Sequence, residues 1–62
     1  MTNSEIVRDI RAMHQEGTDT WECLMYAIDN GLEYPDAVYL VTRALKLTRS
    51  EVEALEEEYQ YR

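Results

Sequence analysis

The feature that most constrains this chain is a repeated start signal for α-helices. Three times, a residue with a small oxygen-bearing side chain is followed three positions later by glutamate. In such a pair, each side chain accepts a hydrogen bond from a backbone N–H group that the first helical turn leaves unpaired. The pairs are Thr2/Glu5, Asp19/Glu22 and Thr48/Glu51. They predict three helix starts within 62 residues, which leaves room only for short helices.

The apolar residues between these starts recur at three- and four-residue spacing, which is the period of a helix with one buried face. Pro35 marks a fourth start, because proline suits the first helical position and disfavours helical geometry in the residue before it. Gly17 and Gly31 follow two of the periodic stretches and favour helix ends. We therefore predict an all-α fold, a compact bundle of four short helices over residues 3–16, 19–30, 35–46 and 49–61.

One small domain, residues 1–62, should contain all four helices, because no linker or low-complexity tract divides the chain. Helix 35–46 has the widest apolar face, so we expect it to lie in the centre, with helix 49–61 at the edge. Trp21 should be the largest contributor to the core. The expected core residues are Ile6, Val7, Ile10, Met13, Trp21, Leu24, Met25, Ile28, Leu32, Ala37, Val38, Leu40, Val41, Ala44, Leu45, Leu47, Val52, Leu55 and Tyr59.

The net charge of −7 argues against a surface that attracts polyanions. No stretch approaches the roughly 18 to 20 apolar residues of a membrane helix. The N-terminus lacks the basic and apolar regions of a signal peptide, and one cysteine cannot form an internal disulfide. These observations predict a soluble, cytoplasmic protein.

The sequence offers no catalytic group of residues. Cys23 and His14 are the one nucleophile–base pair, and helical phase places them on different helices, facing different directions. We expect His14 to flank the core and Cys23 to point towards solvent or an edge. Consecutive glutamates on a helix diverge by about 100°, so Glu56, Glu57 and Glu58 cannot converge on one metal ion. We therefore expect no enzyme activity, no catalytic residue, no cofactor and no metal site.

Residues 37–55 resemble a helix-turn-helix unit, with two helices, a tight turn and apolar residues on both sides. In that family the first residues of the second helix read base edges in the major groove. The resemblance implies that Arg49, Ser50, Glu51 and Glu53 would take this role. Glutamates at such positions would oppose DNA phosphates, so direct binding of nucleic acid is the least favoured interpretation.

The tyrosines are the most suggestive functional signal. The chain has five tyrosines and no phenylalanine. Tyrosines in charged surroundings are typical of protein–protein contacts, where a rigid amphipathic ring contributes area at low entropic cost. We therefore predict a protein-interaction or regulatory module that binds another protein or itself, as a homodimer. The expected contact residues are Tyr26, Tyr34, Tyr39, Glu22, Asp29 and Glu33.

A second interpretation is inhibition by charge mimicry, a strategy of small phage-type inhibitors. An acidic helical surface imitates a phosphate backbone and occupies the nucleic-acid-binding groove of another protein. The 31 positions between Arg11 and Arg43 contain no lysine or arginine, and the last helix is rich in glutamate. Both interpretations stay open on the sequence.

Overall fold

A computed structural model describes residues 2–62 and shows four α-helices, as the sequence predicts. They are α1 (Asn3–Gln15), α2 (Thr20–Asp29), α3 (Tyr34–Leu45) and α4 (Arg49–Tyr61). The predicted bounds differ from these by at most one residue at each end. Helix α3 begins one residue before Pro35, so Tyr34 is its first residue and not part of the preceding loop.

Two of the three predicted start signals form completely. At α1, the N–H of Glu5 donates to Thr2 Oγ1 at 3.3 Å and the N–H of Thr2 donates to Glu5 Oε1 at 3.0 Å. The same reciprocal pair joins Thr48 and Glu51 at α4. At α2 only half forms: Asp19 Oδ1 accepts from the N–H of Glu22, at 2.9 Å, with no return bond among the described residues.

Two helices end at glycines that the sequence predicts, and a third ends at a lysine that it does not. Gly17 and Gly31 take positive φ angles of 98° and 104° after α1 and α2, as their positions predict. After Gly31, the N–H of Leu32 donates to Ala27 O, which folds the partly buried Leu32 side chain back onto the core. Lys46 ends α3 in the left-handed region at φ 54°, where the sequence has no glycine to signal it.

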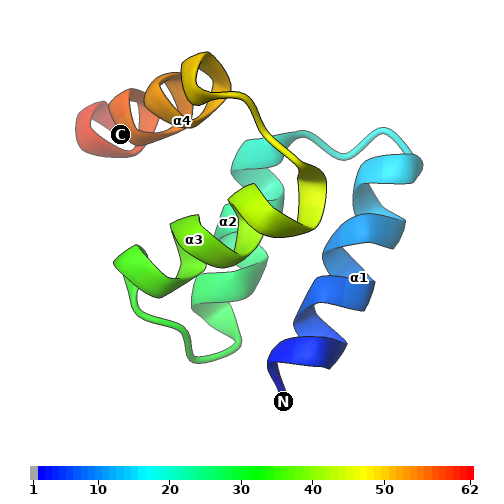
Figure 1. Ribbon diagram of the computed structural model, residues 1–62. Helices are drawn as coiled ribbons and strands as arrows, with labels where there is room; N and C mark the ends of the chain where they lie inside the picture. The colour runs from blue at the N-terminus through cyan, green and yellow to red at the C-terminus, as the bar shows by residue number, and fades with distance from the viewer. Residues whose placement is uncertain (1) are drawn as a thin grey trace.

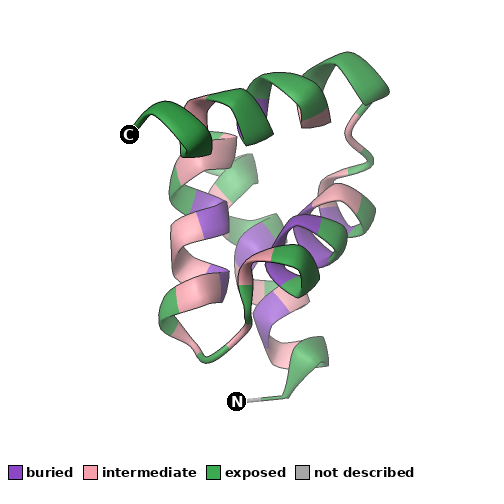
Figure 2. Cartoon of the chain, turned by 90° about the vertical axis from the view of Figure 1, so that its left-hand side faces the viewer, coloured by how far each residue is buried: buried purple, intermediate pink, exposed green. Residues whose placement is uncertain are grey.

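Helices α1, α2 and α3 pack against one another, and α4 lies across this group (Figure 1). Helix α3 packs against each of the other three, which confirms its central position. Helix α4 buries one side chain, Leu55, so most of its surface is open to solvent (Figure 2). The buried residues are Ile6, Ile10, Cys23, Leu24, Ala27, Ala37, Val38, Leu40, Val41, Ala44 and Leu55.

Three expectations about individual side chains are wrong, those for Cys23, His14 and Tyr59. Cys23 is fully buried and does not face solvent, and Ala27, one turn later, is a core residue that the sequence analysis missed. His14 is exposed and does not flank the core. Trp21 is partly buried and packs against the core, and the four largest fully buried side chains are aliphatic. Tyr59 is 40% exposed, because α4 lies at the surface of the bundle.

An aromatic cluster of Trp21, Tyr34 and Tyr59 attaches α4 to the other helices. The rings of Tyr34 and Tyr59 stack with centroids 4.1 Å apart, and the Trp21 ring lies 6.1 Å from that of Tyr59. The Arg62 guanidinium lies over the Trp21 ring at 4.5 Å and contacts the Glu58 carboxylate at 2.6 Å. These contacts join the C-terminal half of α4 to the starts of α2 and α3.

None of the helices within residues 2–62 has both the length and the apolar character that crossing a bilayer requires.

Candidate protein-interaction surface

A groove with a volume of about 470 Å³ lies between α1 and α3. Its apolar lining comes from three elements: Val7 of α1, Leu32 of the α2–α3 turn and Leu40 of α3. Its polar lining consists of Asn3, Asp36, Tyr39 and Arg43. Because Leu32 is held there by the turn after Gly31, the floor is built by local chain geometry as well as by helix packing.

Tyr39 is an exposed aromatic residue of this groove, with 63% of its surface open to solvent. One turn along α3, the Arg43 Nη1 donates to its hydroxyl oxygen at 3.0 Å, and the guanidinium carbon lies 5.6 Å from the ring centroid. These contacts restrict the ring without covering it. An exposed aromatic side chain already held in place loses little conformational entropy when a partner covers it.

The charges of the protein are distributed unevenly among the helices. Helices α1 and α3, which line the groove, each carry as many basic as acidic side chains. Helix α2 carries two acidic residues and no basic one, and α4 carries five glutamates and one arginine. The acidic excess therefore lies mainly on α2 and α4, and the groove lies between the two neutral helices.

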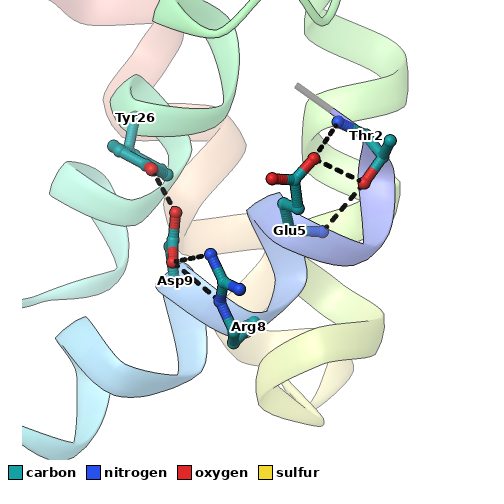
Figure 3. A network of polar contacts seen from close by, with 5 residues as sticks. All are labelled: Thr2, Glu5, Arg8, Asp9 and Tyr26. Atoms are coloured by element: carbon teal, nitrogen blue, oxygen red, sulfur yellow. Dashed lines mark hydrogen bonds and ion pairs between the residues drawn. The ribbon is translucent and has the colours of Figure 1, made fainter.

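Of the six contact residues that the sequence predicts, only Tyr39 lines this groove. Tyr26 lies between α1 and α2, where its hydroxyl donates to Asp9 Oδ2 at 2.5 Å (Figure 3). Asp9 also accepts from Arg8 Nε at 3.2 Å. The hydrogen bond from Tyr26, followed by the contact with Arg8, lowers the pKa of Asp9, and the same hydrogen bond raises the pKa of the Tyr26 hydroxyl.

Tyr34 belongs to the aromatic cluster under α4, so its ring already has a partner in Tyr59. Its partial burial raises the pKa of its hydroxyl, with a smaller effect from Glu56 nearby. The structure thus separates the three predicted tyrosines: Tyr26 holds α1 to α2, Tyr34 holds α4, and Tyr39 is the one with an exposed ring.

The three predicted acidic contact residues are all exposed. Glu22 and Asp29 lie on α2, and Glu33 precedes α3 as its N-cap without a side-chain capping bond. None of them lines the groove. They belong to the acidic excess and not to the surface around Tyr39.

Cys23 and His14, the nucleophile–base pair of the sequence analysis, differ in burial. The Cys23 thiol is fully buried, and this burial, followed by the charges of Asp19 and Glu22, raises its pKa. The reactive thiolate is therefore disfavoured. His14 is exposed on α1, and residues 2–62 contain no group of three or more acidic, histidine or cysteine side chains placed to hold a metal ion.

Sequence reasoning missed the groove because its floor combines residues that belong to three different elements. Val7, Leu32 and Leu40 are all expected core residues, and all three are largely covered. Only the crossing of α1 and α3 leaves them lining a common surface. One local signal was present: Asp36 and Arg43 are seven residues apart, which places opposite charges on one face of the helix around Tyr39.

Comparisons with protein-family models, with curated proteins and with solved structures find no match to this chain.

Proposed function

We propose that this protein is a small, non-enzymatic protein-interaction module whose contact surface is the α1–α3 groove. The observation that carries the proposal is the exposed Tyr39 ring beside an apolar floor, between side chains of opposite charge. An apolar centre with a charged rim is the usual composition of a protein–protein contact. The matching partner presents an apolar side chain flanked by one basic and one acidic group.

The groove has the features that concentrate binding energy. Tyrosine and arginine are enriched among the residues that dominate interfaces, and here the two are in contact. The floor residues Val7 and Leu40 come from helices in the three-helix core, so a partner meets a surface that needs little rearrangement. The net neutrality of α1 and α3 also spares a partner the repulsion that α2 and α4 exert on acidic proteins.

Truncation of Tyr39 tests this function. The tagged protein is used to capture partners from its native cell extract, in parallel with Tyr39→Ala and with Tyr61→Ala as a matched control. Tyr61 is also exposed, by 79%, but lies at the end of α4. We expect Tyr39→Ala to lose at least about tenfold of a captured species, because a hot-spot tyrosine contributes about 2 kcal/mol or more. Equal capture by both variants would remove the groove as the contact surface.

Charge mimicry remains the second candidate, because α4 presents a surface rich in unpaired carboxylates. Arg49 contacts Glu53 at 3.4 Å and Arg62 contacts Glu58, while Glu56 and Glu57 have no cationic partner among residues 2–62. A shallow depression of about 380 Å³, lined by Ala54, Glu57, Glu58, Tyr61 and Arg62, lies on the same helix. This surface suits a basic groove that normally holds a nucleic acid.

Salt dependence separates the two candidates. Binding through the groove should persist when salt rises from about 0.1 M to about 0.5 M, because apolar contact and one or two ion pairs dominate it. Binding by mimicry should weaken steeply over that range and should respond to Glu56→Gln and Glu57→Gln, but not to Tyr39→Ala.

A further inference from the structure

The exposed face of α3 is self-complementary in charge. Asp36 lies in the first turn of the helix and Arg43 in its last turn, and both line the α1–α3 groove. Seven residues correspond to about 10 Å along a helix and to nearly two full turns, so the two charges share one face. Tyr39 and Leu40 lie at the midpoint between them.

A helix with this arrangement matches an antiparallel copy of itself. When a two-fold axis passes between Tyr39 and Leu40, Asp36 of one copy meets Arg43 of the other, and the reverse pair forms on the other side of the axis. The same operation sets Tyr39 of each copy over Leu40 of the other, at the apolar floor. Two-fold interfaces require this property, because one surface patch must complement itself.

The charges available on α3 support this pairing. Asp36 makes no hydrogen bond or ion pair with the described part of the chain. Arg43 contacts the Tyr39 hydroxyl through Nη1, which leaves most of the five N–H donors of its guanidinium for another acceptor. Both charges therefore have bonding capacity that a second copy can use.

The distribution of charge also favours self-contact at this face over others. A protein of net charge −7 repels its own copies, and the repulsion is strongest where α2 and α4 face each other. Helices α1 and α3 are the two neutral helices, so copies approach through them with the least opposition. Among the described residues that line the groove, none belongs to the acidic helices α2 and α4.

From these observations we infer that the partner of the α1–α3 groove is a second copy of this chain, in an antiparallel α3–α3 homodimer. The inference rests on the proposed interaction function and names the occupant of its contact surface. A standard stable interface buries roughly 800 Å² per partner, and we expect one helix face with one groove to bury less. The dimer is therefore weak and reversible.

Charge exchange tests the pairing directly. The purified full chain is studied by sedimentation equilibrium, from about 10 μM to about 1 mM, the range that a small interface requires. We expect Asp36→Arg and Arg43→Asp alone each to weaken dimerisation at least about tenfold, because each places two pairs of like charges across the axis. The double variant should restore it to within about threefold of wild type, because the opposite pairs re-form. Asp29→Arg makes the same charge change on exposed α2 and should leave the dimer intact.

Circular dichroism must first show that each variant is folded, because both charge reversals oppose the dipole of α3 and could destabilise it.

A second measurement does not use the charge-reversal variants. In Tyr39→Cys the new thiol lies beside the axis, and in Tyr61→Cys it lies on exposed α4, while Cys23 stays buried in both. We expect disulfide-linked dimers to form at least about tenfold faster in Tyr39→Cys.

Three results would overturn the homodimer: a monomer mass for wild type at the highest concentration, a double variant no better than the single ones, or equal cross-linking of the two cysteine variants. Such a result leaves the proposed function intact if Tyr39→Ala still loses a captured partner of different mass. If the homodimer is overturned and Tyr39→Ala also captures the same partners as wild type, the groove has no role in binding.

Discussion

Cys23 is in contact with the backbone of α1, and its small size is what allows this contact. Its thiol lies 3.9 Å from the carbonyl oxygen of Ile10, within the range of a weak S–H···O bond. Ala27, one turn along α2, is also fully buried. Two small residues one turn apart let two helices approach closely, which a larger side chain at either position would prevent.

The burial of Cys23 makes its reactivity a probe of folding. We expect a thiol reagent such as dithiobisnitrobenzoate to label the native protein at least about a hundredfold more slowly than an exposed cysteine, because burial disfavours the thiolate. The rate should rise with urea in step with the loss of helix. Tyr61→Cys provides an exposed thiol in the same protein for comparison. Labelling of native Cys23 as fast as that thiol would contradict its burial.

At the scale of elements, α4 is attached differently from the other three helices. The complete capping pair of Thr48 and Glu51 stabilises the first turn of α4. However, Leu55 is the one buried side chain of this helix. The remaining attachment comes from the half-exposed aromatic cluster around Tyr59. A helix held by few buried contacts is expected to open more readily than the core helices.

Leu55→Ala tests this difference. A buried Leu→Ala substitution costs about 2 to 5 kcal/mol, and here the loss falls on the contact between α4 and the core. We expect amide hydrogens of α4 to lose protection from exchange, while those of α1 to α3 keep theirs. Trp21, the one tryptophan, should report the loss of Tyr59 as a fluorescence change. Glu57→Ala, on the exposed face, is the control.

A uniform loss of protection in Leu55→Ala would contradict this view. It would mean that α4 and the three-helix group unfold as one cooperative unit.

At the scale of the whole molecule, three carboxyl groups make the free energy of unfolding depend on pH. The pKa values of Glu5 and Glu51 are lowered chiefly by backbone N–H groups that the capping pairs place beside them. The pKa of Asp9 is lowered chiefly by the hydroxyl of Tyr26, across the α1–α2 contact. All three groups bind protons more weakly in the folded state than in the unfolded state, so acid favours unfolding.

The contribution of Asp9 should therefore be present above its unfolded pKa of about 4 and be lost as the pH falls through its lower folded pKa. We expect Asp9→Asn to lower the urea midpoint of unfolding at pH 7, and the difference from wild type to shrink towards pH 2. Asp29→Asn makes the same substitution on the exposed face of α2 and is the matched control. A difference for Asp9→Asn that stays constant with pH would show that its charge does not contribute.

Much of the fold could be predicted because its signals are local. A capping pair joins atoms three residues apart, and glycine or proline acts through its own backbone angles, so neither depends on the rest of the chain. Lys46 is the exception, because a lysine in the left-handed region carries no sequence signal. There the N–H of Leu47 donates to Thr42 O and closes the end of α3. Helical phase also assigned Cys23 and Tyr59 wrongly, since phase identifies a face but not what covers it.

The candidate groove also depends partly on local sequence signals and partly on tertiary packing. The sequence by itself determined where the four helices start, to within one residue, and which stripe of each is apolar. Only the tertiary structure decided that Val7 and Leu32 meet Leu40 beside the Tyr39 ring, that Tyr26 and Tyr34 are used in internal contacts, and that the neutral helices adjoin. The physical reason is range: hydrogen bonds within one turn are set by neighbouring residues, whereas a surface shared by two helices depends on how they cross.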